Sequence, residues 1–187
     1  MNDTGTKDAK YFIAIIPQEP LFGTLHQLKS YFKEKYNAKA ALRSPPHITL
    51  HMPFLWSERK EPRLVQALAE FAAGRSRFDL NVVHFGSFPP RVIFAAIGES
   101  SNLTQCQQAL HRFCKVTLNL FNANYQERPF HPHITLAFRD LRKEAFAEAW
   151  KEFSHRQLQE AFTVDRICVL KHNGKEWQIH AELRFGL

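Results

Sequence analysis

The chain has 187 residues, is 44% hydrophobic and 13% aromatic, and carries 25 Lys and Arg against 18 Asp and Glu, a formal net charge of +7. A chain of this length and composition forms a core without disulfides or structural metal, which excludes a disordered chain and a membrane protein. The positive charge favours an anionic partner. The three cysteines have no metal-like spacing and are expected to be reduced.

The first half of the chain predicts two strands and two helices. Residues 11–16 form an apolar run typical of a buried strand, and the apolar residues of 21–32 then repeat at helical spacing until Asn37. Residues 47–54 predict a second strand, and the stretch EPRLVQALAEFAAGR predicts a second helix with proline in its first turn. The polar N-terminal decapeptide carries no secretion signal, and YFIAII is too short to span a membrane, so we expect a cytoplasmic protein.

The second half predicts two further helices and a closing hairpin. Alternation and turn signals give strands at 78–85, 92–98 and 132–138, a helix capped by Ser101 that runs to Thr117, a helix at 142–154, and a last strand that begins at Trp177. Asn173 and Gly174 predict a type I′ turn in the hairpin. No linker interrupts the chain, so residues 1–187 are expected to form a single, monomeric α+β domain.

One pentapeptide, Pro-His-Ile-Thr-Leu, occurs twice, with its histidines at positions 47 and 133. Successive side chains of a strand point to opposite faces, so each copy separates a polar face from an apolar face. Regular alternation gives polar faces of His47, Thr49 and His51 in the first copy, and of His133, Thr135, Ala137 and Arg139 in the second. If both strands are central, their polar faces look into one groove.

Two imidazoles and two hydroxyls are the groups that metal-free hydrolysis of a phosphodiester requires. One neutral imidazole serves as general base, one imidazolium serves as general acid, and hydroxyls donate to the nonbridging oxygens. Histidine suits both roles because its ordinary pKa of about 6.5 makes both forms accessible near neutrality.

Paired His-x-Thr motifs of this kind resemble the 2H phosphoesterase superfamily, particularly its bacterial RNA 2′,3′-cyclic phosphodiesterases, historically called 2′-5′ RNA ligases. The resemblance covers nearly the whole chain, from YFIAI through PPHITL, FGSFPPRVIFAAI and FHPHITLAF to the closing hairpin. It implies a bilobal, pseudo-symmetric α+β fold, with two antiparallel sheets lining a central cleft and helices outside. The implied substrates are RNA ends or nucleotides with a 2′,3′-cyclic phosphate, and no cofactor or metal is implied.

The resemblance also implies residue roles: His47 as proton donor to the leaving oxygen, His133 as proton acceptor from water, and Thr49 and Thr135 as phosphate ligands. Some members carry a basic residue two places after the second His-x-Thr-Leu. Here that place is Phe138, and the basic residue is Arg139, which alternation still puts on the cleft face.

Several alternatives stay open at this stage. The same centre could carry out 2′-5′ RNA ligation or cleave 2′-5′-linked oligonucleotides, and the chain could be a nucleotide- or RNA-binding module without turnover. His131 and His133 could hold a metal ion, although no Asp, Glu or Cys nearby completes a typical zinc site. A duplication kept for packing would explain the repeated Ile and Leu, but not the His and Thr on the opposite face.

Overall fold

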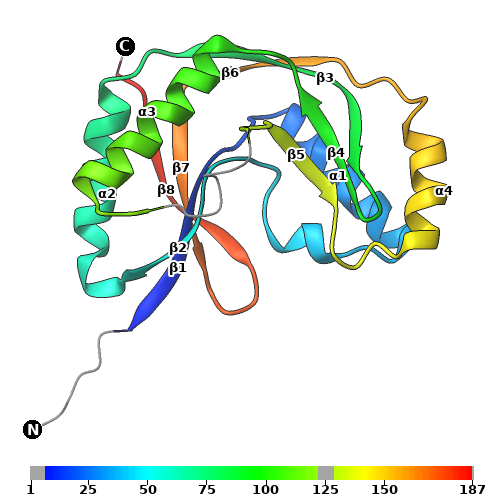
Figure 1. Cartoon of the computed structure of the whole chain (residues 1–187), viewed down its shortest axis with the longest axis horizontal. Coiled ribbons are helices and arrows are strands. Elements are labelled where there is room, and N and C mark those ends of the chain that lie inside the picture. Colours follow the sequence, from blue (N-terminus) through cyan, green and yellow to red (C-terminus); the bar gives the residue numbers. More distant parts are fainter. Residues whose placement is uncertain (1–6, 122–128, 187) are drawn as a thin grey trace, which may run out of the picture.

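The computed structural model describes residues 7–121 and 129–186, which form one curled antiparallel sheet with helices on its outer side (Figure 1). The sheet has eight strands in the order β6-β3-β4-β5-β2-β1-β7-β8. The strands are β1 (Asp8–Ile15), β2 (Ile48–Ser57), β3 (Phe78–Phe88), β4 (Val92–Ile97), β5 (His133–Ala137), β6 (Glu160–Val164), β7 (Arg166–His172) and β8 (Trp177–Arg184). The helices are α1 (Leu21–Tyr36), α2 (Glu61–Ala73), α3 (Ser101–Thr117) and α4 (Lys143–Phe153), with short 3₁₀ helices η1 (Ala40–Arg43) and η2 (Glu58–Lys60).

The sheet divides into two four-stranded lobes between its central strands. β2 and β5 are paired at Ile48 and Ile134 alone among the described residues, whereas every other neighbouring pair of strands forms a longer ladder. Helices α2 and α3 lie outside one lobe, and α1 and α4 lie outside the other (Figure 1). The predicted α+β class and bilobal arrangement are therefore confirmed, and the two expected sheets are joined into one through the pair of Ile48 and Ile134.

A pseudo-twofold relation links the two lobes. The succession β1-α1-β2-α2 is repeated as β4-α3-β5-α4, and the two motif strands are the equivalent, adjacent pair. The helix that follows the first strand of each repeat packs on the motif strand of the other repeat, α1 on β5 and α3 on β2. Each motif strand is thereby held by a helix from the other half of the chain.

Local chemistry sets the ends of the helices. Asn37 adopts a left-handed conformation with φ 53° and its N–H bonds to the carbonyl of Phe32, so it ends α1 as predicted. Ser100 caps α3 through a bond from the Leu103 N–H, one residue before the predicted cap at Ser101.

The helices bury aromatic residues against the sheet. The rings of Phe32 on α1 and Phe153 on α4 stack at 4.6 Å, and Phe85 of β3 meets Phe153 edge-on at 5.0 Å. Both Phe32 and Phe153 are fully buried, so this contact is the centre of one lobe's core. None of the helices within the described residues is long and apolar enough to cross a membrane.

Two local predictions were wrong. No strand was predicted at Glu160–Val164, where β6 forms an edge strand on β3 with only one of five side chains buried. The hairpin between β7 and β8 is a four-residue loop rather than a type I′ turn, since His172 pairs with Trp177 and only Gly174 has a positive φ. The Asn173 side chain shapes this loop by accepting the N–H groups of Lys175 and Glu176.

Candidate active site

The register of the two central strands brings the motif residues together. Ile48 lies opposite Ile134 in an antiparallel ladder, and both side chains are fully buried on the helix side. The flanking positions of such a ladder face each other crosswise on the opposite side of the sheet. His47 therefore lies beside Thr135, and Thr49 lies beside His133, so each hydroxyl is next to the histidine of the other repeat.

A β-bulge in each motif strand interrupts the regular alternation. Ile13 of β1 pairs with His51 and Ala14 with Thr49, so Leu50 is the extra residue of β2; on β5, Leu136 is the extra residue between Thr135 and Ala137. Both bulges fall on the leucine of the repeated pentapeptide. No sequence pattern predicted them, and each bulge ends the polar face after its His-x-Thr.

The bulges correct two expected positions. His51 and Ala137 are buried on the helix side, not on the motif face, and Met52 and Phe138 line the groove in their place. On α3, His111 donates from Nε2 to the carbonyl oxygen of Leu50 at 3.0 Å and so holds the first bulge. His51 lies in the interior beside that ring, with centroids 5.2 Å apart.

Backbone carbonyls fix the protonation of both motif histidines. Nδ1 of His47 lies 2.7 Å from the carbonyl oxygen of Pro45, and Nδ1 of His133 lies 2.7 Å from that of His131. Because a carbonyl only accepts, Nδ1 carries the hydrogen in each ring. The nitrogen left for chemistry is Nε2 in both cases, where the neutral ring accepts a proton and the imidazolium donates one.

Each motif histidine packs against a phenylalanine ring. Phe12 lies 4.9 Å from the His47 ring at 47°, and Phe94 lies 4.9 Å from the His133 ring at 51°. Phe12 and Phe94 are each 3% exposed, so they act as fixed walls. The two phenylalanine rings come from different positions of the repeats, because Phe94 pairs with Thr135 whereas Ala14, not Phe12, pairs with Thr49.

Burial keeps both histidines neutral in the free protein. Burial, with a smaller contribution from the Lys29 ammonium, lowers the pKa of His47 from 6.5 to about 4. Burial also lowers the pKa of His133, and His131 adds to that lowering. A bound phosphate brings negative charge between the rings and favours the imidazolium that an acid catalyst needs.

The motif residues lie in one groove of about 1280 Å³ that runs between the lobes. His47, Thr49, His133, Thr135 and Arg139 all line it, so every site residue expected from the sequence lies in the same groove. Its other lining residues are Phe12, Lys29, Ala40, Ala41, Arg43, Ser44, Met52, Pro53, Phe88, Pro129, His131, Phe138, Asp140, His172 and Trp177.

Arg139 reaches the groove for a different reason from the one expected. The strand ends at Ala137, and Arg139 is the centre of a tight turn with φ 59°, closed by a 2.7 Å bond from the Asp140 N–H to the Phe138 carbonyl. The left-handed backbone, not continued alternation, directs this side chain.

Lys29 is a groove residue that was not predicted from the sequence. It lies on the buried face of α1, is 1% exposed, and donates from Nζ to the carbonyl oxygens of Ala41 and Ser44, both at 3.0 Å. Burial lowers the pKa of Lys29 to about 7. These bonds hold η1, the segment that leads into His47. The sequence pattern that could have indicated this role is a lysine at an apolar position of the helix.

Aromatic side chains line the groove near the motif residues. Trp177 meets Phe12 edge-on at 4.7 Å and His172 at 4.9 Å, while Phe88 lies 5.3 Å from His133 and is 40% exposed. Alternation in the last strand placed Trp177 on an apolar face but did not distinguish a core from a groove. These rings offer flat apolar surfaces on both sides of the motif residues.

The histidines at 131 and 133 were the candidate metal ligands. Their rings lie 6.0 Å apart, and within residues 7–121 and 129–186 no three His, Cys, Asp or Glu side chains form a group that could hold a metal ion.

Comparison with known proteins identifies the family. The sequence model of the 2'-5' RNA ligase superfamily matches residues 17–176. The chain belongs to this superfamily of phosphoesterases. A relative from Halalkalibacterium halodurans, named "Putative phosphoesterase", is 29% identical over 180 residues, which cover 94% of this chain and 97% of the relative.

Solved structures of this superfamily's fold resemble the protein over almost its whole length. TT0787 of Thermus thermophilus has a TM-score of 0.66 at 18% identity, covering 95% of this chain and 98% of the other. E. coli LigT complexed with 3'-AMP has a TM-score of 0.61 at 18% identity, covering 97% and 100%. At this identity the likeness shows the shared fold alone.

Proposed function

We propose that the protein hydrolyses a 2′,3′-cyclic phosphate, at an RNA 3′ end or on a nucleotide, to a 2′-phosphate without a metal ion. The observation that carries the proposal is the crosswise pairing of two His-x-Thr motifs at one ladder pair, which sets two Nε2 atoms and two hydroxyls around one point of the groove. A tetrahedral phosphate fits such a centre because its charge develops on oxygens that the hydroxyls reach.

In the proposed reaction, a water oxygen attacks phosphorus while His133 takes the water proton on Nε2. The bond from phosphorus to the 3′ oxygen breaks, and His47 donates its Nε2 proton to that oxygen, leaving a free 3′ hydroxyl and a 2′-phosphate. Thr49 and Thr135 donate to the nonbridging oxygens, and Arg139 neutralises charge at the phosphate. The two histidines exchange protonation states, and solvent restores them.

Membership of the superfamily and the basic groove support an anionic nucleotide substrate. The solved LigT structures that share the fold hold 3'-AMP, NADP+ or ATP, and Lys29, Arg43 and Arg139 line the groove here. We extend the binding of a nucleotide phosphate to this chain on that basis. In this proposal the substrate is an RNA end or a nucleotide in solution, and no membrane takes part.

The test is hydrolysis of a short RNA with a terminal 2′,3′-cyclic phosphate, in EDTA, by the wild type, His47→Ala and His133→Ala. Each variant is expected to lose about 10²–10⁴-fold in kcat, because each removes one positioned acid or base. Replacing His51, which lies outside the groove, by Gln is the matched control and leaves kcat within a few-fold. Undiminished turnover in either alanine variant contradicts the mechanism, and binding of RNA without turnover by the wild type favours a non-catalytic module.

A further inference from the structure

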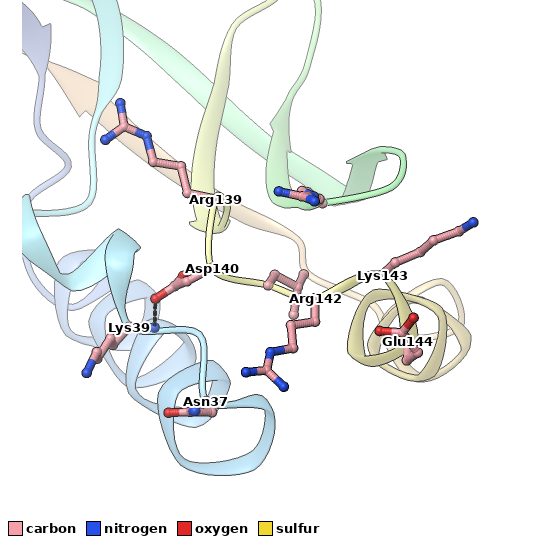
Figure 2. A pocket seen from close by; sticks show the side chains of 9 residues that line it. Asn37, Lys39, Arg139, Asp140, Arg142, Lys143 and Glu144 are labelled. Carbon is pink, nitrogen blue, oxygen red and sulfur yellow. Dashed lines mark hydrogen bonds between the residues drawn. The ribbon is translucent and has the colours of Figure 1, made fainter.

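A second cavity of about 470 Å³ opens beside the groove. It is called the basic pocket here, and it is lined by Asn37, Lys39, Arg91, Arg139, Asp140, Leu141, Arg142, Lys143 and Glu144. Three separate parts of the chain form it: the end of α1, the β3–β4 hairpin and the segment that joins β5 to α4 (Figure 2). Arg139 and Asp140 line both cavities, so the basic pocket continues the groove beyond the proposed reacting centre.

The basic pocket concentrates uncompensated positive charge. Five of its residues are cationic and two are acidic, and in the part of the chain that the structure describes none of the five forms an ion pair. Within the described residues the lysines and arginines that do form ion pairs, Lys35, Arg156, Arg166 and Lys171, all lie outside this pocket. Unpaired guanidinium groups that line a cavity are suited to phosphate, whose oxygens accept two parallel N–H bonds.

Asp140, which lines both cavities, accepts hydrogen bonds from the backbone. One oxygen of Asp140 accepts the N–H groups of Lys39 and Ala40, both at 2.9 Å, and so caps the start of η1. Figure 2 shows Asp140 turned toward Lys39, while Arg139 extends in a different direction from the same turn. That oxygen is therefore committed to η1, whereas Oδ1 is buried without a hydrogen-bond partner among the described residues, and the carboxylate forms no ion pair with the arginines of the pocket.

The backbone of Arg139 adds an independent observation. A left-handed φ of 59° is unfavourable for a residue with a Cβ, and glycine would adopt it freely. Conformations of this kind persist where the surrounding structure needs the side chain in one place. Here the turn separates the directions of Arg139 and Asp140 at the boundary between the groove and the basic pocket.

We propose that the basic pocket binds the internal phosphodiester next to the cyclic phosphate, so that the substrate is an RNA strand and not a mononucleotide. The inference rests on the proposed function, because it extends from the reacting centre to the neighbouring phosphate. Arg142, which extends toward Asn37 in Figure 2, and Arg91 are the arginines that line this pocket without lining the groove. Lys39 and Lys143 extend outward and add charge at the rim.

The test compares two substrates that share the reacting nucleotide: 2′,3′-cyclic AMP and the dinucleotide ApA with a terminal 2′,3′-cyclic phosphate. The wild type is expected to show a higher kcat/KM for the dinucleotide, and a version with a neutral methylphosphonate linkage is expected to lose that advantage. In R91Q/R142Q the ratio of the two kcat/KM values should fall by about 10–100-fold, at roughly tenfold per charge-assisted hydrogen bond. Dinucleotide turnover should also depend less on salt in the variant, because fewer exposed cations attract the substrate phosphates.

Arg63→Gln is the matched control, since Arg63 is an exposed cation on α2, outside the other lobe. It removes the same kind of charge and should leave the ratio unchanged. A dinucleotide advantage that survives either the neutral linkage or R91Q/R142Q overturns the proposal, as does equal turnover of both substrates by the wild type.

A binding measurement separates this proposal from the function that it extends. If the wild type hydrolyses neither substrate, the proposed function fails. The affinity for ApA with a terminal 3′-phosphate then tests whether the basic pocket binds the internal phosphodiester. Weaker binding to R91Q/R142Q than to Arg63→Gln supports the pocket, whereas equal binding to all three proteins refutes it.

Discussion

The pH dependence of kcat/KM is the most direct consequence of the half-buried histidine pair. In the free protein the pKa of His47 falls from 6.5 to about 4, so protonating this ring in the empty groove costs about 3 kcal/mol more than protonating an exposed imidazole, at ~1.36 kcal/mol for each pKa unit. The pKa of His133 is also lowered by burial. The reaction needs one of the two rings protonated, and neither holds its proton above pH 6.5 before substrate binds.

We therefore expect kcat/KM for 2′,3′-cyclic AMP to be maximal below pH 6.5 and to fall about tenfold for each pH unit above it, or about 100-fold between pH 6.5 and 8.5. The alkaline limb of kcat should lie at higher pH than that of kcat/KM, because the bound phosphate stabilises the imidazolium. Initial rates at low and saturating substrate across pH 4.5–9 measure both, with circular dichroism as the control for folding. A kcat/KM maximum at pH 7.5 or above refutes the argument that burial sets these pKa values.

Three further outcomes test the surroundings of the site. Lys29→Met removes a positive charge that lowers the pKa of His47, so the kcat/KM optimum should move to higher pH; an unmoved optimum contradicts that coupling. A Cβ at Gly86 would overlap the Phe94 ring that packs on His133, so Gly86→Val should lower kcat by about 10–100-fold, and wild-type turnover would show that the ring is free to move. In the unfolded chain His47 takes up its proton near pH 6.5, whereas in the folded protein it does so only near pH 4. The free energy of unfolding should therefore be fully present above pH 6.5 and decrease by up to about 3 kcal/mol as pH falls to 4. A free energy of unfolding in urea that does not change over this range contradicts the shift.

Short-range patterns in the sequence predicted most of the fold. The helical spacing of 21–32 and the stop at Asn37 depend on neighbours a few residues apart, and the structure follows them. The alternation expected in the closing strand is broken by a register shift in its pairing with β7, so Ile179 is exposed and Trp177 packs with Phe12 and Leu170 instead of with the core around Leu183. Edge strand β6 was missed because most of its side chains are exposed, so it carries little apolar pattern.

The sequence by itself determined the chemistry of the candidate site, because a strand that carries His-x-Thr presents both groups on one face wherever it lies. Only the tertiary structure decided what those groups meet. The pairing of Ile48 with Ile134 sets each hydroxyl beside the opposite histidine, and the bulges at Leu50 and Leu136 end the polar face.

The electrostatic setting was likewise decided by long-range contacts. Lys29 reaches the groove through carbonyls of η1, and the basic pocket joins residues 37–39, 91 and 139–144, which no local pattern connects. The physical reason is that alternation and helical spacing report only the direction of a side chain relative to its own strand or helix. Its neighbours, its burial and therefore its pKa depend on which distant segments pack against that element.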